Sequence, residues 1–365
     1  MKTGIVSIFD NNNYGTRLQN YALQQVLAKY ARETVTIKNK PYFSGKSRLA
    51  RALPLAESVF LNRVLGMDRR AQMVRFTRRH ISTSRYCYWY DKDGSRIHQP
   101  DHCDLYCAGS DQVWNPTCGR GGMFSFLGFA DRDQTFSYAA SFGVDRIPEQ
   151  YQEDVRKGLQ HIKYISVRED AGKRIVEELT GRTDVQVLVD PTMLLTAQEW
   201  DQVARKPEAP LPERYLLTYF LGKVSAERRA TIEQKAKELG CQIIELMDKN
   251  SPFYAIGPGE FVYFIKHAAL VCTDSFHGSV FSFLYGRPLI IMDRQGSGEN
   301  MGSRLMTLAD KFSLLDCLAT GNVLPEVPGE PDYSAGYAAL EEERKKSKAF
   351  LDMVFQEAER AGLCD

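Results

Sequence analysis

The sequence lacks a long apolar run, and no stretch approaches the roughly 18 residues of a membrane-spanning helix. It also lacks an excess of either charge, because 47 basic and 46 acidic side chains leave a net charge of +1. This balance argues against bulk nucleic-acid binding. The first residues, MKTGIVSIFDNNN, are too briefly apolar for a signal peptide and predict a strand, so we expect a cytoplasmic protein.

Paired cysteines are missing as well. Eight cysteines are scattered over 365 residues without a CxxC pair. Cys103 and Cys107 lie near His102, but zinc ligands usually come in tighter pairs, so reduced thiols are the preferred interpretation. We therefore expect no metal site.

What the sequence does contain is a regular alternation of short apolar runs and amphipathic segments. Residues 4–9 predict a buried strand, apolar side chains recur at helical spacing from Thr16 to Tyr30, and residues 34–40 predict the next strand. Further strands are predicted at 105–110, 134–141, 164–169, 185–191, 215–222 and 241–248. This order predicts an α/β fold built on parallel sheets.

A segment rich in proline and charge divides the chain. Residues 201–214 contain three prolines and mark a linker. We predict an N-terminal Rossmann-like domain over 1–200 and a C-terminal Rossmann-like domain over 215–330, facing each other across a cleft. A charged amphipathic helix is predicted over 335–365, where it packs back onto the first domain.

The segment 46–80 is unusually basic. It carries nine basic and only two acidic side chains, interleaved with leucine, valine and phenylalanine. We predict a basic helical insertion over about 45–95. Two interpretations stay open: a solvated helical insertion, which we prefer, or a segment that lies on the anionic inner face of a membrane.

The most informative stretch is 271–290, VCTDSFHGSVFSFLYGRPLI. An apolar run ends at a polar turn, an apolar helix-like segment follows, and a second apolar run begins at Leu289. We predict strand, turn, helix and strand. Ligands bind at the carboxyl ends of parallel strands, and the start of a helix offers N–H groups to an anion. His277, at the helix start, can move a proton near neutral pH.

Similar polar turns follow the other predicted strands. The sequences concerned are NNNYGTRLQNYALQ (11–24), AGSDQVWNP (108–116), SYAASFG (137–143), VREDAG (167–172), VDPTMLL (189–195) and TDSFHGSVFSFLYGRPLI (273–290), with a further SRL at 303–305. As an ordered set over residues 1–320, they resemble the polysaccharide pyruvyl transferase family.

That resemblance implies a GT-B-like fold and transfer of the enolpyruvyl unit of phosphoenolpyruvate onto a sugar as a cyclic ketal. The N-terminal domain is then the acceptor side and the C-terminal domain the donor side. The acceptor implied is a lipid-linked saccharide or a nascent bacterial capsule or exopolysaccharide. No cofactor is implied beyond the donor substrate, and the oligomeric state is left open.

The resemblance and the chemistry together assign roles to strand-end residues. His277 is the expected general acid. Arg168 suits bidentate binding of a carboxylate or phosphate, and Asp111 is the expected base for a sugar hydroxyl. Trp114 is placed on a sugar face, although a core position is the commoner one for tryptophan. The remaining expected substrate-binding residues are Gly15, Ser141, Asp274, Ser275, Gly278, Arg294 and Arg304.

Two other functions stay open at this stage. A GT-B glycosyltransferase would use the same fold with a nucleotide sugar. It would need an apolar slot for the base and a carboxylate for the ribose, and no clear signal of either is found. A catalytically silent saccharide-binding protein is the second alternative, against which the presence of His277, Arg168 and Asp111 argues.

Overall fold

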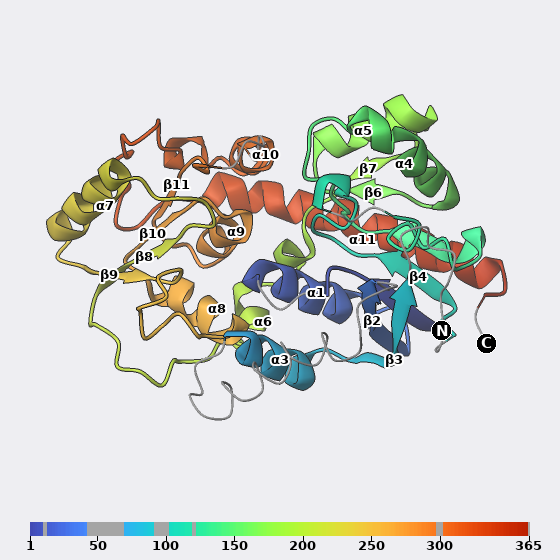
Figure 1. Cartoon of the computed structure of the whole chain (residues 1–365), viewed down its shortest axis with the longest axis horizontal. Coiled ribbons are helices and arrows are strands. Elements are labelled where there is room, and N and C mark those ends of the chain that lie inside the picture. Colours follow the sequence, from blue (N-terminus) through green and yellow to red (C-terminus); the bar gives the residue numbers. More distant parts are fainter. Residues whose placement is uncertain (10–12, 42–68, 91–101, 119–121, 297–301, 364–365) are drawn as a thin grey trace, which may run out of the picture.

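The computed structural model describes residues 1–9, 13–41, 69–90, 102–118, 122–296 and 302–363. These residues form two halves, each built on a parallel sheet with helices packed around it (Figure 1). The fold is thus of the predicted class, α/β with two Rossmann-like halves. The predicted domain boundaries stay predictions, although residues 202–214 contain neither helix nor strand.

The sheet of the first half has five parallel strands in the order β3-β2-β1-β4-β5. Its strands are β1 (Lys2–Val6), β2 (Glu33–Pro41), β3 (Thr83–Tyr90), β4 (Leu105–Ala108) and β5 (Thr135–Ser137). Helix α1 (Tyr14–Leu27) crosses from β1 to β2, and Asn13 caps its start by accepting from the Gly15 N–H at 2.9 Å. The helix is buried along nearly its whole length because it lies between the two halves.

A small two-stranded sheet continues this edge. Strands β6 (Ser166–Val167) and β7 (Gln186–Val187) are parallel, and isolated bridges such as Ala140 with Val167 join them to the region after β5. Helices α4 (Glu149–His161) and α5 (Asp170–Thr180) pack beside them. The carboxyl ends of β4, β5 and β6 therefore lie along one edge.

The sheet of the second half has four parallel strands in the order β11-β10-β8-β9. Its strands are β8 (Tyr215–Tyr219), β9 (Gln242–Glu245), β10 (Leu270–Thr273) and β11 (Leu289–Ile291). Its helices are α7 (Ala226–Glu238), α8 (Pro258–His267), α9 (Phe276–Leu284) and α10 (Gly302–Lys311), and the short α6 (Ala197–Asp201) precedes the sheet. The predicted strand, turn, helix and strand over 271–290 are confirmed as β10, α9 and β11.

The expected helical insertion needs a correction. Residues 46–68 lie outside the described residues. Residues 69–80 form a helix, α3 (Arg69–His80), but β3 then pairs with β2 as the edge strand of the first sheet. Its sequence TSRYCYWY is rich in aromatic residues, which favour strands.

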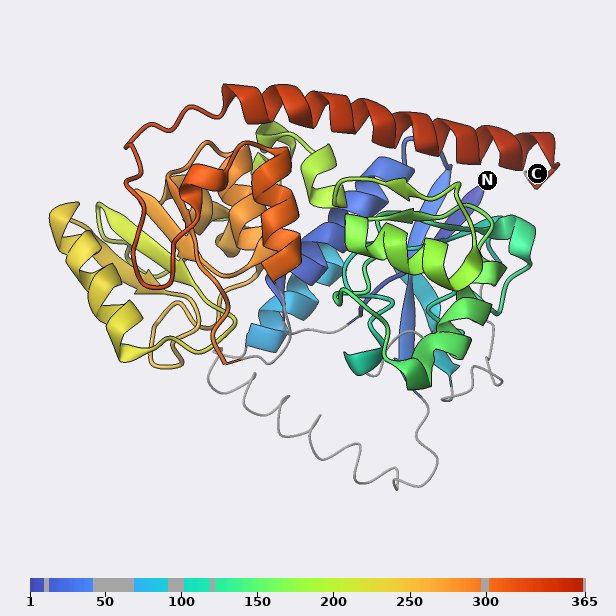
Figure 2. The same cartoon turned by 90° about the horizontal axis from the view of Figure 1, so that it is seen from above.

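The last helix, α11 (Ser334–Arg360), runs along both halves (Figure 2). At one end the Tyr337 hydroxyl donates to the Phe283 carbonyl at 2.9 Å in the second half. At the other end Phe355 stacks on Tyr30 in the first half, with ring centroids 4.8 Å apart. The helix therefore ties the two sheets together on the side away from α3.

Candidate active site

The start of α9 is held by local hydrogen bonds that the sequence explains. The Ser275 hydroxyl accepts from the Gly278 N–H at 3.3 Å and so caps the helix. The Thr273 hydroxyl accepts from the Ser275 N–H at 3.0 Å. This fixed turn presents His277, which is 6% exposed, to the first half of the molecule.

Gly15 lies directly against the His277 ring. A Cβ atom at position 15 would lie 2.1 Å from the Nδ1 atom of His277, so the close approach of α1 to the imidazole requires glycine. The sequence predicted a site role for Gly15. In the structure, the absence of a side chain at Gly15 leaves the space that the His277 ring occupies.

Asp190 is the centre of the site. Its Oδ1 accepts from the Thr192 N–H at 3.0 Å and from the Thr192 hydroxyl at 2.7 Å. Its Oδ2 accepts from Arg168 Nη1 at 2.7 Å and from the Ser110 hydroxyl at 2.9 Å, and lies 3.6 Å from His277 Nε2. One carboxylate thus links the histidine of the second half to the arginine of the first.

Arg168 is buried among three carboxylates. Besides Asp190, it lies 3.5 Å from Glu169 and 3.7 Å from Asp111, and its guanidinium carbon is 4.6 Å from the centroid of the Phe276 ring. Burial alone would lower the pKa of Arg168, but the three carboxylates raise it above the usual value. The arginine is therefore permanently charged and rigidly held.

Asp111 has an unusual backbone. Its φ of 65° is in the left-handed region, which an aspartate tolerates better than most residues. The Thr16 hydroxyl donates to its Oδ2 at 2.6 Å. Burial would raise the pKa of Asp111, but Arg168, His277 and this hydrogen bond outweigh burial and hold it below its usual range. Asp111 is thus an ionised carboxylate of low basicity.

Arg304 and Arg294, the two arginines expected to bind the substrate anion, have different surroundings. Arg304 on α10 is 8% exposed, and the Gln112 amide oxygen, turned toward it, accepts from its two terminal nitrogens at 2.8 and 3.0 Å. Burial and the nearby Arg168 lower the pKa of Arg304 to about 10, so it keeps its charge at neutral pH. Arg294 instead lies 3.5 Å from the Asp274 carboxylate.

Asp274 is engaged in holding the backbone. Its two carboxylate oxygens accept from the Leu221 N–H at 2.7 Å and from the Gly222 N–H at 2.8 Å. The side chain is 1% exposed. The expected substrate contact is therefore replaced by a structural one, in which Asp274 fixes the loop after β8.

Trp114 and Ser141 also need correction. Trp114 is fully buried, stacks on Phe126 and donates its indole N–H to the Ser125 carbonyl, so it belongs to the core and not to a sugar-binding face. The buried Ser141 hydroxyl donates to Glu169 at 2.5 Å. Ser141 thus positions Glu169 beside Arg168 and is not itself open to a substrate.

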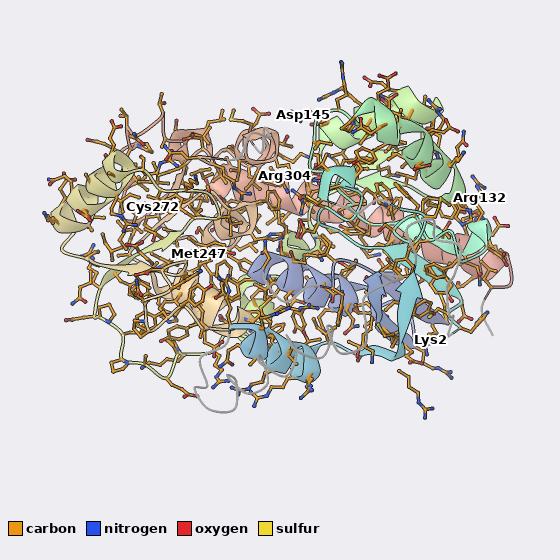
Figure 3. All side chains as sticks on the ribbon, viewed as in Figure 1. Lys2, Arg132, Asp145, Met247, Cys272 and Arg304 are labelled. Carbon is orange, nitrogen blue, oxygen red and sulfur yellow. The ribbon has the colours of Figure 1, made fainter. Side chains whose placement is uncertain are left out.

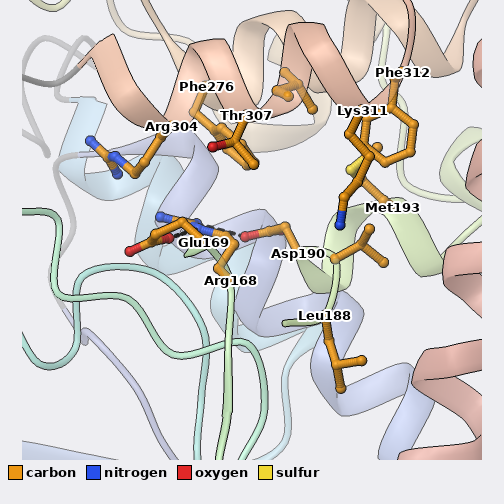
Figure 4. A pocket seen from close by; sticks show the side chains of 12 residues that line it. Arg168, Glu169, Leu188, Asp190, Met193, Phe276, Arg304, Thr307, Lys311 and Phe312 are labelled. Atoms are coloured by element: carbon orange, nitrogen blue, oxygen red, sulfur yellow. Dashed lines mark hydrogen bonds and ion pairs between the residues drawn. The ribbon is translucent and has the colours of Figure 1, made fainter. Parts of the chain in front are cut away.

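A hollow lies beside this cluster (Figure 4). It is lined by polar side chains, among them Arg168, Asp190 and Arg304, and by an apolar wall that includes Phe276 and Leu308. Its volume is about 20 Å³, which is room for about one water molecule. A substrate larger than water therefore enters this hollow only if the lining side chains turn.

Sequence reasoning counted Asp190 among the strand-end polar residues but gave it no individual role, and it gave none to Glu169 or Ser110. Asp190 was visible only as the aspartate of an Asp-Pro turn after a predicted strand, and nothing local shows that it meets His277, which is 87 positions later. Among the described residues, no group of three or more metal-binding side chains is found. Within the same residues, no helix is both long and apolar enough to cross a bilayer.

Comparison with known proteins gives a family and a fold. A family model described as polysaccharide pyruvyl transferase matches residues 13–296. A putative UDP-N-acetylglucosamine 2-epimerase from Listeria monocytogenes is 10% identical, with a TM-score of 0.52 over 98% of this chain and 90% of its own. The UDP-N-acetylglucosamine 2-epimerase from Rickettsia bellii is 11% identical, with a TM-score of 0.51 over 98% and 97%. At these identities the likeness shows the GT-B-like fold alone, and no curated protein matches the chain.

Proposed function

Because this chain belongs to the polysaccharide pyruvyl transferase family, we propose that it transfers the pyruvyl unit of phosphoenolpyruvate to a saccharide as a cyclic ketal. The observation that supports this most is the contact of His277 with Asp190 beside Arg168. A donor that carries a carboxylate and a phosphate needs cations to hold it, and its methylene carbon needs an acid. Here a cation, Arg168, and a candidate acid, His277, both lie beside Asp190.

The proposed reaction starts with transfer of a proton from His277 to the methylene carbon of the donor. The neighbouring carbon becomes oxocarbenium-like, and a first sugar hydroxyl forms a C–O bond to it. The C–O bond to phosphate then breaks, and a second hydroxyl forms the second C–O bond. Of the two hydroxyl protons released, one restores His277 and the other leaves with phosphate.

Asp190 and Asp111 have distinct roles in this proposal. Asp190 holds the imidazole and Arg168 in fixed relation, as a carboxylate behind a catalytic histidine does in other enzymes. Asp111 lies 3.7 Å from Arg168. Its low basicity suits it to accept a proton late and pass it on to phosphate, since a hydroxyl bonded to an oxocarbenium carbon is strongly acidic. Arg168 and Arg304 are the proposed anion contacts, together with the N–H groups at the start of α9.

The test is phosphate release from phosphoenolpyruvate in the presence of galactosyl, glucosyl, mannosyl and N-acetylhexosaminyl acceptors, free and lipid-linked. We expect release with one acceptor class and a product heavier by one pyruvate less one water. Absence of release with every acceptor, together with thermal stabilisation by a nucleotide sugar, would favour a glycosyltransferase instead.

Replacement of Gly15 by alanine is expected to lower turnover by roughly 10²-fold, because displacement of a catalytic group by about 1 Å has an effect of this order. The new methyl group would push the His277 ring from its seat. Gly329→Ala is the matched control, since no atom lies within 4 Å of a methyl group there. Steady-state kinetics of both variants checks this. Equal activity of Gly15→Ala and Gly329→Ala would show that catalysis does not require the His277 ring at this position.

A lipid-linked acceptor would place the enzyme at the inner membrane face. Helix α3 buries Met73, Phe76 and Thr77 and exposes Arg75, Arg78 and further arginines on its other side. Membrane contact through this helix predicts co-sedimentation with vesicles that contain anionic lipid but not with zwitterionic vesicles, whereas the preferred solvated helix predicts no difference between them. Replacing Arg75, Arg78 and Arg79 by glutamine should weaken it, and equal sedimentation with both vesicle types would contradict membrane contact through this helix.

A further inference from the structure

A second buried arginine lies apart from the cluster around Asp190. Arg69, the first residue of α3, is 7% exposed. Its guanidinium carbon is 4.2 Å from the centroid of the Tyr14 ring, and its Nη1 is 3.1 Å from Met247 Sδ. Among the residues that the structure describes, its Nε and Nη2 atoms have no hydrogen-bond partner, and no carboxylate forms an ion pair with it.

Two tyrosine hydroxyls share this environment. Tyr14 and Tyr219 are almost fully buried. Within the described part of the chain neither hydroxyl group makes a hydrogen bond of good geometry, and the Tyr219 hydroxyl lies close enough to Arg69 to interact with it. Burial, partly offset by Arg69, raises the pKa of Tyr219 to about 12, and burial likewise raises the pKa of Tyr14 well above its usual value. Both hydroxyls are therefore protonated at neutral pH and can donate hydrogen bonds.

Most of the unsatisfied hydrogen-bonding capacity around Arg69 belongs to donors, because the guanidinium can only donate and each tyrosine hydroxyl can donate as well as accept. A guanidinium has no acceptor atom, and a buried positive charge without a partner is costly. Contact with the Tyr14 ring offsets part of this cost, but it does not satisfy the N–H groups. The thioether of Met247 is only a weak acceptor. What would complete this group is an acceptor with negative charge.

The position of the group suits a ligand. Tyr219 ends β8, and Met247 follows the end of β9, so both lie at the carboxyl edge where ligands bind in open parallel sheets. Tyr14 directly precedes Gly15, which touches His277. Met247, labelled in Figure 3, lies in the second half of the molecule. It is 37% exposed, and a flexible methionine of this kind can swing aside to open a path to the guanidinium.

From these observations we infer that Arg69, Tyr14 and Tyr219 form an anion-binding subsite for a phosphate or carboxylate group at the junction of the two halves. Its ligand comes either from phosphoenolpyruvate or from an anionic group of the acceptor, such as a sugar phosphate. The subsite uses side chains other than Arg168 and Arg304. The identity of its ligand rests on the proposed function, whereas binding of phosphate to it can be measured without turnover.

The test uses the full-length protein and measures binding of inorganic phosphate by calorimetry. Arg69→Met should lower phosphate affinity by at least about tenfold, the usual effect of losing a charge-assisted hydrogen bond. The melting temperature without phosphate should stay equal or rise, because a buried unpaired charge has been removed. Arg75→Met is the matched control, since it removes an exposed arginine of the same helix.

Affinity for phosphate equal to that of Arg75→Met would overturn the inference and leave Arg69 as a packing residue. If Arg69→Met does not fold, the double variant Tyr14→Phe and Tyr219→Phe removes only the hydroxyl groups. It should weaken phosphate binding by at least about threefold, and unchanged binding would again overturn the inference.

Kinetics then identifies the source of the anion. A rise in KM for phosphoenolpyruvate with an unchanged KM for the acceptor assigns the subsite to the donor, and the reverse assigns it to the acceptor. Because phosphate binding is measured without turnover, loss of binding in Arg69→Met would support the subsite even if no pyruvyl transfer were found. Conversely, pyruvyl transfer with unchanged phosphate binding would refute the subsite alone.

Discussion

His277→Ala is expected to lower turnover by on the order of 10²- to 10⁴-fold, the range that a positioned acid contributes. The ring is 6% exposed and lies between Gly15 and the Asp190 carboxylate, so it is held at one place at the edge shared by the two halves. Removal of the ring leaves Arg168, Arg304 and Asp111 in position. Binding of donor and acceptor should therefore persist while the chemical step fails.

The measurement compares kcat and KM with the acceptor affinity obtained by calorimetry. His267→Ala is the matched control, because His267 is exposed on α8 and stacks only on Tyr263. The control should keep full activity. Unchanged turnover in His277→Ala would remove the histidine from the acid role, and loss of acceptor binding as well would point to a structural defect.

Asp190→Asn is expected to lower kcat by roughly 10²-fold with little change in KM. An asparagine of the same shape can still accept from Thr192 through its oxygen and can donate to Ser110 through its NH2 group. It loses the negative charge that faces His277 and Arg168 and the bond from Arg168. A comparable loss of a carboxylate behind a histidine costs about 10⁴-fold in serine proteases, which sets an upper bound. Asp184→Asn, which removes an exposed carboxylate paired with Arg182, is the control and should be fully active.

The stability of the Asp190→Asn variant gives an independent pH test. Burial would raise the pKa of Asp190, but His277 and Arg168 outweigh it and hold that pKa far below the usual value. Its contribution is therefore fully present above about pH 4, the unfolded value, and is lost as pH falls further. Urea unfolding should show the variant less stable by about 1–3 kcal/mol at pH 7. That difference should shrink below about pH 4, and a constant difference would contradict this role.

The fold was largely predictable because its signals are local. In 271–290 the apolar run, the polar turn and the apolar helix each follow from a few neighbouring residues, and the structure contains β10, α9 and β11 there. Strand β3 was missed for the opposite reason. Its aromatic pattern lies beside a strongly basic segment, and its place at the sheet edge depends on pairing with β2 more than 40 residues earlier.

The site was predictable in its position but not in its connections. Strand-end placement indicated that Asp111, Arg168 and His277 would gather, and they do. Whether a strand-end residue faces a ligand or the backbone is not encoded nearby. Asp274 was therefore expected to contact the substrate, but it accepts from two backbone N–H groups. Trp114 was expected to stack on a sugar, but it is buried in the core. Asp190 was noted as a strand-end residue, but its contacts with Arg168 and His277, which join the two halves, are recognisable only in the folded structure.

The proton that His277 is proposed to deliver provides the most direct test of the central claim. The reaction should be run in D₂O with the preferred acceptor, and the product examined by mass spectrometry and NMR. Our account predicts one solvent-derived deuterium in the ketal methyl group, present in wild type and formed far more slowly by His277→Ala. A product that keeps an intact enolpyruvyl methylene group, or that carries a transferred hexose, would contradict it.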